Sequence, residues 1–185
     1  TPAGAKKLAA LVRACPVLKS ACLAYGLPLV SGKDSMKNDA FSGGRKISIK
    51  PTLLVTLMGE IADVRKAVST DFKAAGDLVY AIGRCGGQLG CSIYERVTGR
   101  THGPCPKADP ERAMKTYRAL HRAMAGKIVR SCHDVSDGGL AVALAESCLG
   151  GRLGCEVDAG NSPGAEGLEA ARLLFSESPS RFVVS

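Results

Sequence analysis

Aromatic side chains are scarce in this sequence: only 4% of its 185 residues are Phe, Tyr or Trp, and Trp is absent. Proteins that bind single-stranded nucleic acid stack the bases on such rings, so a stacking surface of that kind is hard to build here. No run of five or more Lys or Arg occurs either. We therefore expect no nucleic-acid partner, and the net charge of +8 favours small anions such as phosphorylated metabolites.

Long apolar runs and paired cysteines are also missing. No stretch reaches the roughly 18 uninterrupted apolar residues of a membrane helix, and the first residues lack the charged-then-apolar order of a signal peptide. The eight cysteines form no CxxC pair, and disulfide frameworks belong to short secreted chains with small cores. We expect a cytoplasmic protein without a membrane partner, with reduced, structural cysteines; a zinc site is the weaker alternative.

Hydrophobic residues make up 45% of the chain, enough for one domain or two small ones. Apolar residues spaced by three and four predict a helix over Ala5–Tyr25, kinked or broken at Pro16. A short buried strand is expected after it at Leu27–Val30, and a second, longer strand at Lys46–Ile61. The polar, glycine-bearing stretch Ser69–Gly76 marks a domain boundary.

Strand and helix patterns alternate beyond that boundary, which favours a layered α/β or α+β fold. The surface loop of this half is expected at Thr98–Pro110, after a glycine-rich turn and a short helix. The predicted strands are Leu78–Gly83, Ile128–Cys132, Leu153–Val157 and Arg181–Val184, and the predicted longer helices are Pro110–Ala125, Leu140–Leu149 and Gly167–Phe175.

The loop Ser31–Asp39 gathers two lysines, two acids, two hydroxyls and an amide directly after a predicted strand. Such a loop can hold phosphate and a metal ion together. It is no Walker P-loop, because Gly26 and Gly32 have the wrong spacing and Asp34 follows the lysine. From the residues alone, a polar surface turn and a ligand loop stay equally good interpretations.

A second polar segment, Cys132–Leu140, joins a predicted strand to a predicted helix. The N-terminus of a helix favours phosphate, and a magnesium ion bound by Asp134 would relieve the repulsion between carboxylate and phosphate. The alternative is an ordinary helix cap by Ser136 or Asp137, with the two following glycines allowing a tight turn. Adjacent His133 is expected to be structural, because neighbours on a strand point to opposite faces.

A third segment, Phe175–Arg181, places an acid and three hydroxyls between a helix and a strand, and by itself indicates little. The segments SGKDSMKND, PTLLVTLMGEIADV, HDVSDGGLAVALAES and LFSESPSRFVV, taken in this order, resemble the second synthetase half of the formylglycinamide ribonucleotide amidotransferase (phosphoribosylformylglycinamidine synthase) family. The resemblance runs through nearly the whole chain. HDVSDGGL is its most specific part, although aminoimidazole ribonucleotide (AIR) synthetase and selenophosphate synthetase carry similar glycine turns.

The resemblance implies an AIR synthetase-like fold, with a partial A domain at 1–66 and most of a B domain at 67–185. Both ends read as unfinished. The activity it implies is an ATP-dependent carbon–nitrogen ligation in purine biosynthesis, in which ammonia from glutamine converts formylglycinamide ribonucleotide to its amidine. ATP, Mg²⁺ and the remaining synthetase and glutaminase domains or subunits are the implied cofactors and partners, and this piece alone is expected to be inactive.

The resemblance also implies roles for single residues. Gly32 and Lys33 are candidate ATP contacts and Ser35 a candidate substrate contact. Relatives have a magnesium-binding Asn where Lys33 stands, and protonated lysine cannot ligate the ion, so Asp34 becomes a candidate metal ligand instead.

In the larger single-chain members of the family, the position of Asp134 binds magnesium and that of Ser136 contacts a nucleotide in an auxiliary site. The family's catalytic histidine has no counterpart here, so no catalytic residue is expected. Two alternatives from other classes remain: a stand-alone ATP-binding relative of AIR synthetase and selenophosphate synthetase, and a non-catalytic basic binding module.

Overall fold

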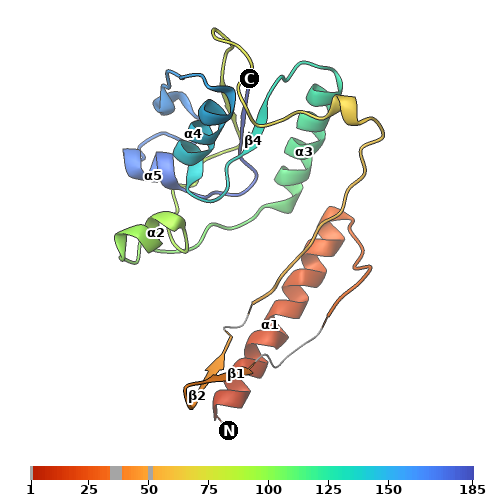
Figure 1. Cartoon of the computed structure of the whole chain (residues 1–185), viewed down its shortest axis with the longest axis vertical. Coiled ribbons are helices and arrows are strands. Elements are labelled where there is room, and N and C mark those ends of the chain that lie inside the picture. The colour runs from red at the N-terminus through yellow and green to blue at the C-terminus, as the bar shows by residue number, and fades with distance from the viewer. Residues whose placement is uncertain (1, 34–38, 50–51) are drawn as a thin grey trace. The chain divides into compact units, whose positions relative to one another are not determined.

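The computed structural model describes residues 2–33, 39–49 and 52–185 (Figure 1). The chain divides into two compact units, Thr1–Glu60 and Ile61–Ser185.

The first unit contains helix α1 (Pro2–Tyr25) and a hairpin of strands β1 (Asp39–Ser42) and β2 (Arg45–Ser48). The predicted helix is confirmed. It ends at Tyr25, and the φ of 67° at the following Gly26 lies in the left-handed region that glycine adopts without steric cost. The helix continues through Pro16, so the predicted break does not occur.

Both strands predicted for this unit are wrong in extent or in kind. Leu27–Val30 is exposed and irregular, and of the described residues of Lys46–Ile61 only those shared with β2 are strand. A strand needs a neighbour for its backbone N–H and C=O groups. Among the described residues of this unit the only strand pair is β1 with β2, in antiparallel register with Asp39 opposite Ser48.

Residues Gly4–Tyr25 of α1 are long and apolar enough to cross a membrane, judged by length and composition alone. The rule of uninterrupted apolar runs missed this segment because Arg13 and Lys19 interrupt it. A core helix of a soluble protein meets the same criteria, so they do not decide between the two. No described side chain of the first unit is buried.

The second unit is built on a three-stranded antiparallel sheet of β3 (Tyr80–Ile82), β4 (Cys132–Asp134) and β5 (Phe182–Val184). The strand order is β3-β5-β4, so β5 is central and pairs with both neighbours. The helices are α2 (Ile93–Thr98), α3 (Pro110–Ala125), α4 (Gly139–Gly151) and α5 (Ala170–Phe175), and single 3-10 turns lie at Val64–Lys66 and Ala159–Asn161.

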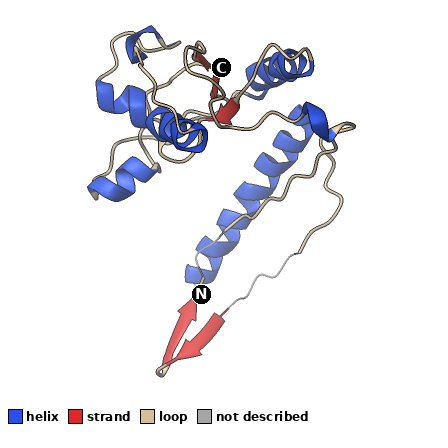
Figure 2. Ribbon diagram, turned by 45° about the horizontal axis from the view of Figure 1, so that its top comes forward, coloured by secondary structure: helices blue, strands red, loops and turns tan. Residues whose placement is uncertain are grey.

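Helices cover both faces of this sheet, with α4 and α5 on one side and α3 on the other (Figures 1 and 2). Val183 of β5 is 1% exposed and lies in a core cluster with Leu140 and Leu144 of α4. Its neighbour Phe182 packs edge-on against Tyr117 of α3, with the ring centroids 5.9 Å apart. Successive residues of a strand point to opposite faces, so β5 joins the two helical layers.

Most predicted elements of the second unit are confirmed, with changed bounds. Helices α3, α4 and α5 stand where helices were expected, α5 being shorter, and β3 and β5 lie within their predicted strands. The strand predicted at Ile128–Cys132 lies further along the chain, as β4, because Cys132 is the first residue of this segment that pairs with β5, opposite Val184. The strand predicted at Leu153–Val157 is wrong. The segment is irregular, and its Leu153 packs against the core beside α4.

Cysteines are partly oxidised in this structure. Cys91 and Cys105 form a disulfide, with their Cα atoms 5.6 Å apart, a separation usual for such bonds. The expectation of reduced cysteines is therefore wrong for this pair, because the fold brings together two loop positions that 14 residues separate in sequence. The free cysteines are Cys15, Cys22, Cys85, Cys132, Cys148 and Cys155.

Two buried serines give a test of this packing. Ser147 of α4 is 0% exposed, and its hydroxyl has no hydrogen-bond partner among the described residues. Ser147→Ala removes that unsatisfied hydroxyl and adds helix propensity, so we expect the free energy of unfolding to rise by about 1 kcal/mol. Ser176→Ala is the matched control, since the buried Ser176 hydroxyl bonds to Ser178 Oγ at 2.8 Å; it should lower stability by about 1 kcal/mol. Urea unfolding measures the stability of both variants. A loss of stability in both would contradict the conclusion that the Ser147 hydroxyl is unsatisfied.

Candidate functional site

The turn between β4 and α4 carries the polar segment singled out in the sequence. Asp134 ends β4, and its side chain is 64% exposed. Val135 is buried and donates its N–H to the Arg181 carbonyl at 2.9 Å, while Ser136 beyond it is exposed. The structure therefore places Asp134 and Ser136 at one solvent-facing turn, anchored to the strand segment behind it.

Glu177 organises this turn from the far end of the chain. Its Oε1 accepts the Gly138 N–H and the Ile93 N–H, each at 2.8 Å. Gly138 is the N-cap of α4 and Ile93 the first residue of α2, so one carboxylate oxygen meets two helix N-termini. Unpaired amides and a positive dipole end make such positions favourable for a negative charge.

The predicted cap by Ser136 or Asp137 is wrong. Gly138, which has no side chain to make a cap bond, is the N-cap of α4. The Gly139 N–H donates to the Ser136 carbonyl at 3.0 Å. The N–H groups of Gly138 and Gly139, which would face a bound phosphate, are therefore already hydrogen-bonded. Gly138 donates to Glu177 and Gly139 to the Ser136 carbonyl.

Both glycines of the turn are required, as the sequence indicated. Gly138 has φ of 81° and Gly139 φ of 74°, values that L side chains rarely adopt. A Cβ on Gly139 would also lie 2.7 Å from the Leu174 carbonyl oxygen and 2.8 Å from Phe175 Cα. The absence of this side chain lets α4 start directly against the end of α5.

Sequence reasoning gave Glu177 no role, although it noted an acid flanked by hydroxyls. Ser178, on one side of it, is buried and accepts the Gly86 N–H at 2.9 Å. Buried Arg181 donates to the Ser176 carbonyl at 3.2 Å, and burial lowers the pKa of its guanidinium. These contacts fix the backbone on both sides of Glu177.

His133 and Cys132 have no arrangement typical of a nucleophilic site. The imidazole of His133 is 12% exposed; its Nε2 lies 2.9 Å from Glu146 Oε2 and its Nδ1 2.7 Å from the Asp134 carbonyl oxygen. The contact with Glu146 ties β4 to α4, in agreement with a structural histidine. Burial, and next the negative charge of Asp134, raise the pKa of the Cys132 thiol, which disfavours the reactive thiolate.

The other candidate residues belong to the first unit. Gly32 and Lys33 lie in an exposed loop, whereas the candidate positions Asp34 and Ser35 lie outside the described residues. No group of three His, Cys, Asp or Glu side chains suited to a metal ion occurs in the described ranges. Magnesium can bind through one or two carboxylates plus phosphate oxygens and water. The exposed Asp134 can supply one such carboxylate.

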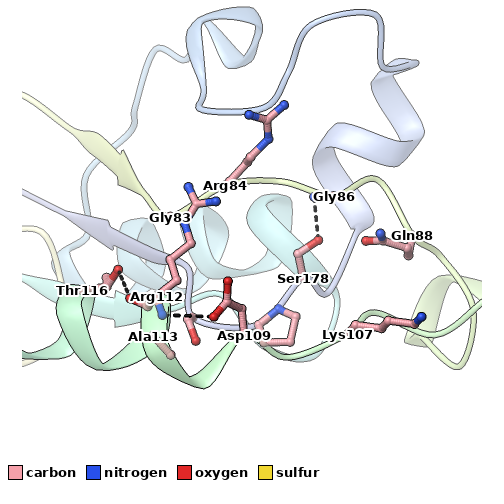
Figure 3. Close-up of a pocket in the computed structure, with 12 residues that line it drawn as sticks. Gly83, Arg84, Gly86, Gln88, Lys107, Asp109, Arg112, Ala113, Thr116 and Ser178 are labelled. Carbon is pink, nitrogen blue, oxygen red and sulfur yellow. Dashed lines mark hydrogen bonds between the residues drawn. The ribbon is translucent and has the colours of Figure 1, made fainter.

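A cavity of about 170 Å³ lies between the loop after β3, the start of α3 and the segment Ser178–Ser180 (Figure 3). Its lining includes the cations Arg84, Lys107 and Arg112 and one carboxylate, Asp109, which accepts the Arg112 N–H at 3.1 Å as the N-cap of α3. Three cations against one acid suit an anionic group. None of the predicted site residues lines this cavity.

Residues 74–185 match the family of AIR synthase related proteins, C-terminal domain. The phosphoribosylformylglycinamidine synthase subunit PurL of Thermococcus sibiricus is 39% identical over 168 residues, which are 91% of this chain and 23% of that protein. The chain thus spans less than a quarter of the length of the curated relatives it matches.

Solved structures show the same fold. Thermotoga maritima PurL complexed with FGAR matches 89% of this chain and 27% of its own with a TM-score of 0.63 at 21% identity. T. maritima PurL complexed with ATP matches 65% of this chain and 19% of its own with a TM-score of 0.53 at 22% identity. The chain has the AIR synthetase-like fold that its sequence predicted.

The role of Glu177 gives a direct prediction. Glu177→Ala removes the acceptor shared by α2 and α4, and we expect it to lower the free energy of unfolding by about 3–6 kcal/mol, the scale of two hydrogen bonds to a charged group. Glu177→Gln retains one acceptor oxygen and should lose about half as much. Glu166→Ala, at an exposed acid nearby in sequence, is the control and should change stability by less than about 0.5 kcal/mol. Equal stability of Glu177→Ala and Glu166→Ala in urea unfolding would disprove the role.

Proposed function

This chain belongs to the family of AIR synthase related proteins, and on that premise we propose that it is part of the synthetase region of a phosphoribosylformylglycinamidine synthase. In this proposal the parent protein uses ATP to convert formylglycinamide ribonucleotide, with ammonia from glutamine, to the amidine in purine biosynthesis. The observation that carries the proposal is the 39% identity to a PurL subunit over 91% of the chain.

The proposed domains are a partial A domain at 1–66 and most of a B domain at 67–185. The division of the structure into Thr1–Glu60 and Ile61–Ser185 supports a boundary in this region. The family match begins later, at residue 74. The proposed partners are the remaining synthetase domains and a glutaminase domain or subunit.

Unpartnered apolar residues in the first unit support the proposed synthetase partner. Leu8 and Val12 of α1 are 57% and 62% exposed, and exposed apolar surface of this kind favours burial against another element. We propose that the rest of the A domain covers this helix in a cytoplasmic enzyme. A membrane would require Arg13 and Lys19 to enter hydrocarbon, which is costly.

The exposed β4–α4 turn is the proposed nucleotide contact of the second unit. Asp134 would supply one carboxylate oxygen to magnesium, and Ser136 a hydroxyl to the nucleotide. Magnesium bound there would neutralise the charge between the carboxylate and the phosphates. Gly32, Lys33, Asp34 and Ser35 are the proposed contacts of the first unit to ATP, metal and substrate.

The turn can be tested by substitution in the full-length parent protein. Asp134→Asn should weaken magnesium-nucleotide binding by roughly tenfold or more, since it removes a charged metal ligand. Its folding should be nearly unchanged, because the carboxylate is exposed. Asp137→Asn, an exposed acid in the same turn, is the matched control and should retain binding. Calorimetric titration with Mg-ATP measures the affinity and thermal unfolding the stability; unfolding without a change in affinity would instead favour a purely structural carboxylate.

The whole proposal is tested by turnover. We expect the purified 185-residue chain to form no amidine from ATP, magnesium, formylglycinamide ribonucleotide and ammonia. Part of the proposed site cannot hold the phosphate, the metal and the substrate oxygen in reacting geometry. The parent protein should form amidine and ADP together under the same conditions. Amidine production by the short chain would favour the stand-alone enzyme, and DNA binding with a steep salt dependence would favour the basic binding module.

A further inference from the structure

Two free cysteines lie side by side where α4 ends. Cys148 is in the last turn of the helix and Cys155 in the loop that follows. The Cys148 thiol donates to the Cys155 sulfur, and the two Sγ atoms are 3.4 Å apart. Cys155 is exposed and Cys148 half-buried, so a small molecule in solution can reach the pair.

The backbone around both sulfurs is held by several contacts. Phe72 donates its N–H to the Ser147 carbonyl at 3.1 Å, which fastens the last turns of α4. Leu153 donates its N–H to the Cys148 carbonyl at 3.0 Å and packs against the core cluster of α4 and the sheet. Between them Arg152 takes a positive φ of 53° and reverses the chain. The close approach of the sulfurs therefore follows from an ordered helix end.

We propose that Cys148 and Cys155 form a reversible disulfide by exchange with a small-molecule disulfide such as oxidised glutathione. A disulfide needs its two sulfurs to approach from 3.4 Å to about 2.05 Å, so the gap left to close is about 1.4 Å.

The exchange takes place in two steps. The exposed Cys155 thiolate attacks one sulfur of the oxidised reagent, forms a mixed disulfide and releases one reduced thiol. The Cys148 thiolate then attacks Cys155 Sγ, forms the Cys148–Cys155 bond and releases the second reduced thiol. Two protein thiols lose two electrons and two protons, and the reagent's disulfide gains them.

The order of attack follows from the surroundings of the two sulfurs. Burial, and next the hydrogen bond to Cys155, raise the pKa of the Cys148 thiol. A neutral thiol attacks slowly, so the exposed sulfur meets the reagent first. The remaining free cysteines of the described chain have no second thiol at hydrogen-bond distance, which makes the pair the expected site of intramolecular closure.

Peptide mapping of the full 185-residue chain tests the proposal. After incubation with oxidised glutathione, the remaining thiols are alkylated and the chain is cut with trypsin. Cleavage after Arg152 separates the peptide 131–152, which contains Cys148, from the peptide 153–172, which contains Cys155. We expect these two peptides to stay linked, with a mass about 2 Da below their sum, and to separate on reduction with dithiothreitol.

Matched variants distinguish this pair from its neighbours. Peptide 131–152 also contains Cys132, so Cys132→Ser should retain the link and Cys155→Ser should abolish it. Cys15→Ser, at an exposed cysteine elsewhere, is the control and should retain it. Loss of the link in Cys132→Ser, or complete alkylation of Cys148 and Cys155 in the folded, oxidant-treated chain, would overturn the proposal. A stable glutathione adduct on Cys155 without closure would overturn it too.

Discussion

The carboxylate of Glu177 is the interaction on which the second unit depends. One oxygen accepts the N–H of Ile93, the first residue of α2, and the N–H of Gly138, the N-cap of α4, so two helices that are more than forty residues apart in sequence start at the same point. A carboxylate suits this position because each helix presents unpaired N–H groups and the positive end of its dipole there. The hydroxyls of Ser176 and Ser178 and the buried Arg181 keep the backbone of Glu177 in place.

The same segment leads directly into β5, which connects the two helical layers. Val183 enters the core beneath α4, and Phe182 meets Tyr117 of α3 on the opposite face. The β4–α4 turn is thus fixed from behind by the Val135–Arg181 hydrogen bond and from the side by Glu177. Only the outer part of the turn, with Asp134 and Ser136, remains open to solvent, as a ligand contact requires.

The two units differ in how much apolar surface they bury. The second unit has a core that includes Leu140, Leu144 and Val183, whereas no described side chain of the first unit is buried. Burial of apolar surface is the main favourable term in folding, so the second unit carries its own stability. The exposed apolar residues of α1 agree with the proposal that other synthetase domains complete the first unit.

The sequence by itself determined α1, α3 and α4, because three-and-four spacing of apolar residues and the flanking Gly and Pro are local signals. It also determined the fold family, through HDVSDGGL and LFSESPSRFVV. The strands were less predictable: Ile128–Cys132 and Leu153–Val157 have strand-like residues, but only pairing with a neighbour decides where a strand begins. Tertiary structure alone decided the Cys91–Cys105 bond and the cap of α4 by Glu177. Both join positions distant in sequence, and their geometry exists only after the chain has folded.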